Sequence, residues 1–143
     1  MMDKVAVIYW SGTGNTEMMA KYIAEGVKAA GGEADVFSVS DFSQGNLADY
    51  ARFALGCPAM GAEELEDSEF QPFYDAVKPS LAGKKVALFG SYGWGGGEWM
   101  NPWKADAEAA GLVLVAEPLA IESAPDDAGK TACADLGKTL LQA

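Results

Sequence analysis

The sequence predicts an α/β domain built on a five-stranded parallel sheet, and three observations support this fold class. Five apolar segments of strand length alternate with longer segments whose apolar residues recur every three or four positions. Glycine-rich loops follow three of the apolar segments. The 143 residues, half of them hydrophobic, contain no internal repeat and no linker. We therefore expect residues 1–143 to form a single domain with a substantial core.

The predicted elements follow one another in strand–helix order, which gives a parallel sheet with right-handed crossovers. Strands are predicted at Lys4–Trp10, Ala34–Val39, Arg52–Cys57, Lys85–Gly90 and Leu112–Ala116, with a further apolar piece at Leu119–Ile121. Helices are predicted at Asn15–Ala30, Glu98–Ala110 and Pro125–Leu141. A further helix is predicted between the third and fourth strands, with Pro72 in its first turn and its end at Val77. The polar segment Ser40–Tyr50 predicts no regular element.

Side-chain spacing identifies core positions on two of the helices. Met19, Ile23 and Val27 repeat every four residues along the first helix and predict its buried face. Gly31-Gly32 follows this helix and is typical of a helix end. Trp99 and Trp103 lie one turn apart on the third helix, and we expect them in the core rather than at a binding site.

The loop Ser11-Gly12-Thr13-Gly14-Asn15-Thr16 follows the first strand and leads into the first helix. Its glycines allow a sharp turn and a close approach of the backbone to an oxyanion, and the helix N-terminus favours negative charge. The loop has no Gly-Lys-Ser/Thr and no basic residue, and Glu17 replaces the third glycine of a dinucleotide motif. Neutral donors indicate the phosphate monoester of a cofactor that stays bound. The alternative is a plain turn with a helix cap.

Two further glycine-rich loops carry large soft or aromatic side chains. Gly56–Glu64 contains Met60, and Ser91–Trp99 contains Trp94 between glycines. Such side chains suit the two faces of a flat ring system, through stacking and sulfur–aromatic contacts. Each loop tip could instead fold back on the protein, but three such loops together favour a cofactor site.

These loops resemble the phosphate loop and the two isoalloxazine loops of the short-chain flavodoxins of anaerobic bacteria. The resemblance covers nearly the whole chain and includes near-continuous matches at Leu55–Gly61 and Ala87–Gly95. It implies a three-layer sandwich with helices on both faces of a sheet in the order 2-1-3-4-5, with the ligand at the carboxyl ends of strands one and three. Only Glu117–Ala124 separates Ala116 from the last helix, which indicates the short type.

The resemblance also implies which residues bind noncovalent FMN. The phosphate is assigned to Ser11, Gly12, Thr13, Gly14, Asn15 and Thr16, and the ring lies between Met60 and Trp94. Glu63 is assigned to the ring N3–H, and the peptide between Gly61 and Ala62 to the flavin N5. Backbone groups contact the ribityl chain and ring edges, namely those of Pro58, Ala59, Ser91, Tyr92, Gly93 and Gly95.

Charge and composition limit the partners. A net charge of −11 argues against nucleic acid and anionic membranes, and it favours redox enzymes with basic docking surfaces, such as ferredoxin-type donors and acceptors. The run Glu63–Glu69 is the most acidic; it could steer partners and make the cofactor harder to reduce, or be a solvated helix start. The chain has no histidine, and Cys57 and Cys133 form no C-x-x-C pair, so we expect reduced structural thiols. No membrane span or leader is evident, so we expect a cytoplasmic protein. We also expect it to be a monomer.

We therefore expect a low-potential one-electron carrier and not an enzyme, with no catalytic acid or base and no metal site. The main alternative is a small FMN-dependent quinone or nitro reductase, which would need one open ring face for its substrate. A phospho-acceptor domain would need an Asp where Cys57 ends the third strand and acids where Trp10 ends the first.

Overall fold

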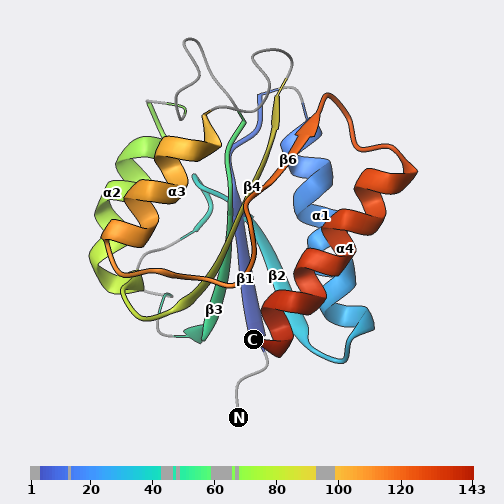
Figure 1. The fold of residues 1–143 in the computed structure, drawn as a ribbon, viewed down its shortest axis with the longest axis horizontal. Coiled ribbons are helices and arrows are strands. Elements are labelled where there is room, and N and C mark those ends of the chain that lie inside the picture. The colour runs from blue at the N-terminus through green and yellow to red at the C-terminus, as the bar shows by residue number, and fades with distance from the viewer. Residues whose placement is uncertain are drawn as a thin grey trace.

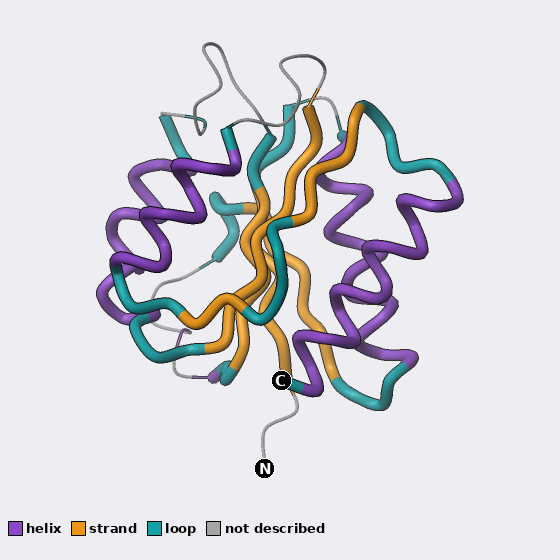
Figure 2. Tube along the Cα trace, viewed as in Figure 1, coloured by secondary structure: helices purple, strands orange, loops and turns teal. Residues whose placement is uncertain are grey.

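The structure, a computed structural model, describes residues 4–12, 14–42, 47, 49–58, 66, 68–92 and 99–143. A parallel sheet lies between two pairs of helices, with α2 and α3 on one face and α1 and α4 on the other (Figure 1). Figure 2 shows the same three layers by secondary structure. The helices are α1 (Asn15–Ala29), α2 (Phe70–Leu81), α3 (Met100–Ala109) and α4 (Asp127–Gln142). The strands are β1 (Lys4–Tyr9), β2 (Glu33–Ser38), β3 (Arg52–Gly56), β4 (Lys85–Tyr92), β5 (Val113–Leu114) and β6 (Leu119–Glu122).

The strand order β2-β1-β3-β4-β5 agrees with the order that the resemblance implies. β1 is an interior strand and pairs in parallel with both β2 and β3, so that Ile8 lies opposite Phe37 on one side and Leu55 on the other. The order of the strands reverses between β1 and β3. In open α/β sheets, ligands bind outside the carboxyl ends of the strands at such a reversal.

The fifth position of the sheet is occupied by two short strands rather than one. β5 pairs with the start of β4 through Val113 and Leu114, and β6 pairs with its end from Phe89 to Tyr92. Residues 115–118 lie between them: Val115 N still donates to Val86 O, and residues 116–118 have no partner residue on β4 among the described pairs. The predicted strand at Leu112–Ala116 is thus shorter than expected, since only Val113–Leu114 forms a strand, and the second apolar piece at Leu119–Ile121 lies in β6. In the part of the chain that the structure describes, the sheet therefore has six strands rather than the predicted five, with β5 and β6 both beside β4.

Alternate residues of β1 belong to two separate cores. Ala6 and Ile8 pack beneath α2 and α3, whereas Val5 and Val7 pack beneath α1 and α4. A strand that is covered on both faces must be apolar at successive positions, which explains the continuous hydrophobic run in the sequence. The predicted core residues are confirmed: Met19, Ile23 and Val27 lie in the α1–α4 layer, and Trp99 and Trp103 in the α2–α3 layer.

The second helix is longer than predicted. It continues past Val77 to Leu81 and contains Pro79 in its last turn. Pro79 has no N–H to donate to residue 75, and its ring crowds the carbonyl there, so a proline at this position would ordinarily end or kink a helix. Burial of Val77 and Leu81 against the sheet holds this turn in place.

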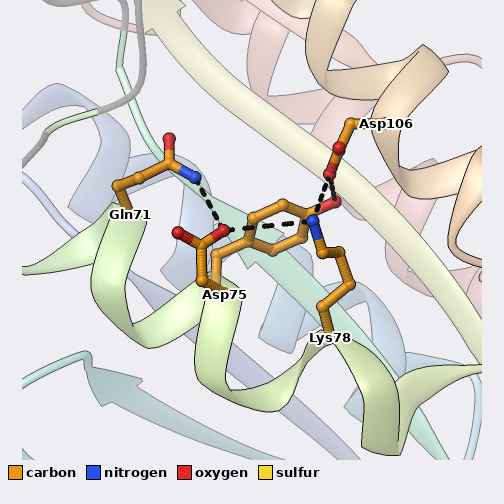
Figure 3. A network of polar contacts seen from close by, with 5 residues as sticks. Gln71, Asp75, Lys78 and Asp106 are labelled. Atoms are coloured by element: carbon orange, nitrogen blue, oxygen red, sulfur yellow. Dashed lines mark hydrogen bonds and ion pairs between the residues drawn. The ribbon is translucent and has the colours of Figure 1, made fainter.

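A polar network joins α2 to α3 across the outer rim of their layer (Figure 3). The Tyr74 hydroxyl donates to Asp106 Oδ2 at 2.8 Å, and Lys78 Nζ donates to the same oxygen at 3.0 Å. Lys78 also lies 3.9 Å from Asp75, which accepts a bond from Gln71. The network gives the buried Tyr74 hydroxyl a charged acceptor at the edge of the core.

We expect Asp106→Asn to lower the free energy of unfolding at neutral pH by about 1 kcal/mol. The hydrogen bond and charge of Lys78, with the Tyr74 hydroxyl, outweigh burial and lower the pKa of Asp106. A carboxyl whose pKa is lower in the folded state adds stability above its unfolded pKa, near about 4, and loses it as the pH falls through the folded pKa. Urea unfolding should therefore show a difference between wild type and variant that shrinks from about pH 7 to about pH 3. A difference independent of pH would contradict this explanation. The matched control is Asp75→Asn, because Asp75 also lies near Lys78 but accepts no hydrogen bond from Tyr74.

Candidate functional site

The loop after β1 forms a helix N-terminus that is open to an anion. Gly14 precedes α1 with φ +94°, a left-handed conformation that favours glycine, and its N–H donates to Ser11 Oγ at 3.0 Å. The first helical bond runs from Met18 N to Gly14 O. No side chain in the described part of the loop caps this end of α1. The first N–H groups of the helix have no acceptor within the helix itself, so they can bind an oxyanion.

Thr16 joins this loop to the end of β4. Its side chain is buried, and its Oγ1 accepts a hydrogen bond from Ser91 N at 3.3 Å. A hydroxyl that accepts one bond still has its proton to donate. Thr16 can therefore donate to a phosphate while its bond to Ser91 N fixes the distance between the loop after β1 and the end of β4.

The end of β4 is fixed by a residue that the sequence analysis did not identify. Ser91 Oγ donates to Ser123 O at 2.8 Å, and Ser123 N donates to Tyr92 O at 2.8 Å. Ser123 follows β6 and has φ +58°, which is uncommon for a non-glycine residue. No sequence pattern marks such a position. These two bonds hold the start of the third loop against the end of β6.

The end of β3 lies beside the end of β4. Cys57 N donates to Phe89 O at 3.1 Å, and Trp99 Nε1 donates to Cys57 O at 3.2 Å. Cys57 and Cys133 are free thiols, buried in different core layers. Burial raises the pKa of both thiols to about 12. The expected role as structural thiols agrees with this placement.

Glu66 is buried, whereas one interpretation of the acidic run Glu63–Glu69 was a helix start whose carboxylates are all solvated. It is 5 % exposed, and its carboxylate accepts the N–H groups of Ser68, Glu69 and Phe70 at 2.8–2.9 Å. Burial alone would raise the pKa of Glu66, but these bonds and the Ser68 hydroxyl outweigh it and lower the pKa. Glu66 is thus a buried cap of α2. Glu69 is exposed and accepts from Trp10 Nε1 at 3.1 Å, which ties β1's end to the start of α2.

The structure brings eight predicted site residues to the carboxyl ends of three adjacent strands. Five of them follow β1, namely Ser11, Gly12, Gly14, Asn15 and Thr16. Pro58 follows β3, and Ser91 and Tyr92 are the last two residues of β4. The other predicted site residues lie outside the described residues: Thr13, Ala59, Met60, Gly61, Ala62, Glu63, Gly93, Trp94 and Gly95.

The family model of the flavodoxins ("Flavodoxin") matches residues 7–137 of this chain. The chain belongs to the flavodoxin family. It is 46% identical to the flavodoxin of Megasphaera elsdenii over 139 residues, which cover 97% of this chain and 99% of that protein. It is 45% identical to the flavodoxin of Clostridium beijerinckii over 134 residues, 94% of this chain and 96% of that one. The solution structure of two-electron reduced Megasphaera elsdenii flavodoxin superposes with a TM-score of 0.87 at 47% identity, covering 97% and 99% of the two chains.

A flavodoxin is an electron carrier that binds FMN, and this chain shares that function with its relatives. The described residues fit the phosphate end of FMN. The uncapped N-terminus of α1, the left-handed Gly14 and the free proton of Thr16 supply donors without a basic side chain. When bound, FMN supplies the redox chemistry, and the protein sets which of its redox states are stable.

Proposed function

We propose that this flavodoxin binds FMN through all the predicted site residues and passes single electrons at low potential between redox enzymes. The phosphate would lie on residues 11–16 and the ring between Met60 and Trp94, with Glu63 at the ring N3–H. The observation that carries the proposal is the hydrogen bond from Ser91 N to Thr16 Oγ1, because it joins the phosphate loop to the root of a ring loop. With a residue against each ring face, electrons would pass through the exposed ring edge.

Reconstitution and titration test this function directly. We expect the purified protein to bind one FMN and to bleach in two one-electron steps during anaerobic reduction. We expect it to pass electrons to a ferredoxin-dependent enzyme, and to show no sustained NADH–quinone turnover. Absence of FMN binding, or quinone turnover at rates typical of enzymes, would overturn the proposal.

The distribution of charge supports a basic docking surface on the partner. Nine acidic residues and no lysine or arginine lie in the segments that follow β1, β3, β4 and β5, together with the end of β4 and all of β6: residues 10–16, 57–69, 91–99 and 115–126. Basic residues instead begin three strands at the opposite edge of the sheet: Lys4, Arg52 and Lys85. The resulting field orients the cofactor edge toward a positively charged partner, and salt weakens it.

We expect the double substitution Glu64→Gln/Asp67→Asn to raise the potential of the second one-electron reduction by about 70 mV. One carboxylate ~10 Å from an anionic flavin, at an effective dielectric constant of ~40, contributes about 0.8 kcal/mol, or about 35 mV for one electron. Glu66 must stay unchanged, because it caps α2. Potentiometric titration at low and high salt measures the shift, which should be smaller at high salt.

The matched control for this charge change is Glu25→Gln/Glu33→Gln, which removes two exposed carboxylates on α1 and at the start of β2. Equal shifts in the two double variants would show that the potential follows net charge and not the acidic run. An unchanged potential in both would restrict the run to solubility or docking.

We also propose that the protein is a cytoplasmic monomer formed by one domain. None of the helices that the structure describes is long and apolar enough to cross a membrane. Two buried free thiols suit a reducing compartment. The last helix packs beside the first on one face of the sheet, so both ends of the chain contribute to one core (Figure 1). Light scattering after gel filtration tests the monomer.

A further inference from the structure

Cys57 lies where the described ends of the two proposed ring-binding segments meet. Segment 59–65 is bounded by Pro58 and Glu66, and segment 93–98 by Tyr92 and Trp99. The residue that follows each segment makes a hydrogen bond to Cys57. Glu66 N donates to Cys57 Sγ at 3.3 Å, and Trp99 Nε1 donates to Cys57 O at 3.2 Å.

Cys57 is itself held rigidly. Its N–H continues the β3–β4 ladder by donating to Phe89 O at 3.1 Å, and its side chain has no exposed surface. Trp99 is buried as well and packs against the ring of Tyr92, with centroids 5.7 Å apart. The first residues after both segments are therefore fixed to one point on the central sheet.

The sulfur atom suits this position. The thiol accepts from Glu66 N and points its own proton toward Pro58 O, 3.5 Å away, so it contacts both ends of segment 59–65. A serine hydroxyl has a shorter bond to Cβ and reaches less far, and alanine leaves a buried N–H without its acceptor. Since the pKa of Cys57 is raised to about 12, the group remains a neutral thiol at neutral pH.

We propose that Cys57 is a positioning residue for the flavin ring: its Sγ and its carbonyl oxygen hold the ends of both ring-binding segments in register. The proposal rests on the function proposed above. It implies that the side chain of Cys57, although neutral, affects FMN affinity and both potentials through the segments that it holds.

The test compares Cys57→Ala with Cys133→Ala, which removes an equally buried thiol from the α1–α4 layer. Riboflavin, which lacks the phosphate, isolates binding at the ring. We expect Cys57→Ala to raise the dissociation constant of riboflavin about tenfold, the effect of one lost buried hydrogen bond, and to shift both FMN potentials. Cys133→Ala should leave the affinity and both potentials unchanged. Trp99→Phe, which removes the indole donor and part of the buried ring, should act in the same direction as Cys57→Ala. Cys57→Ser should restore part of the affinity.

A second readout tests the contact without a cofactor. In the FMN-free protein, hydrogen exchange at the Glu66 amide should be slow in wild type and in Cys133→Ala, and at least about tenfold faster in Cys57→Ala. Equal affinities, potentials and exchange rates in the two alanine variants would overturn the role of Cys57 while the flavodoxin function stands. If wild-type protein failed to bind FMN, the proposed function would fall, and the amide exchange would still report the contact. Should Cys57→Ala fail to fold, Cys57→Ser and Trp99→Phe decide the question by the same measurements.

Discussion

Gly90→Ala is expected to lower the free energy of unfolding by about 3 kcal/mol, at the upper end for overpacking a core. A Cβ at residue 90 would lie 2.1 Å from Cys57 O and 2.9 Å from the Trp99 ring. The carbonyl is backbone that is fixed by the ladder bond from Cys57 N to Phe89 O, so it cannot move aside cheaply. Because the same carbonyl accepts from Trp99, the variant should also bind FMN more weakly.

The control for this variant is Gly31→Ala. Gly31 has φ +99°, and no atom lies within 4 Å of the point that a Cβ would occupy, so alanine there meets strain but no clash. Strain of this kind costs roughly 1–2 kcal/mol. Urea unfolding of both variants gives the comparison, and FMN titration should show lost affinity in Gly90→Ala alone. Equal stabilities would mean that β3 and β4 separate at their ends more easily than the structure indicates.

Trp94→Ala is expected to raise the FMN dissociation constant about thirtyfold, since stacking on a ring of this size contributes roughly 2 kcal/mol. Stacking should be stronger with the neutral oxidised ring than with the electron-rich reduced one. Loss of Trp94 should therefore make the second one-electron reduction easier. Trp94 lies outside the described residues, and its place at the ring comes from the sequence.

Flavin fluorescence titration and potentiometry measure both effects. Trp103→Phe is the control, because Trp103 packs against Phe70 and Tyr74 in the α2–α3 core, at 5.5 and 6.1 Å between ring centroids. It should lower stability and leave FMN affinity unchanged. If affinity and both potentials of Trp94→Ala matched those of wild type, Trp94 would not lie on the ring.

The sequence predicted those features that depend on local pattern. Continuous apolar runs identified the strands, and the four-residue repeat of Met19, Ile23 and Val27 identified the buried face of α1. The glycine-rich loop after the first strand predicted a sharp turn into α1, and Gly14 adopts a left-handed conformation there.

Features that depend on contacts between distant residues could not be predicted. Glu66 belongs to an acidic run in which several carboxylates could cap α2, and its bonds to Glu69 N and Phe70 N are local, so the fold is needed only to show which acid turns inward. The left-handed Ser123 and the thiol contact of Cys57 depend on residues far along the chain. α2 extends beyond its predicted end at Val77 because burial of Leu81 outweighs the local effect of Pro79.

The break between β5 and β6 makes this edge of the sheet a natural place to lengthen the chain. Val115 N still donates to Val86 O, but none of the pairs that the structure describes joins β4 to residues 116–118. A peptide or a whole domain spliced between Ala116 and Glu117 would therefore interrupt no rung of the sheet. The affinity tag or fluorescent label that a partner assay needs can be placed there, provided that Glu117 keeps its 2.9 Å ion pair with Lys104.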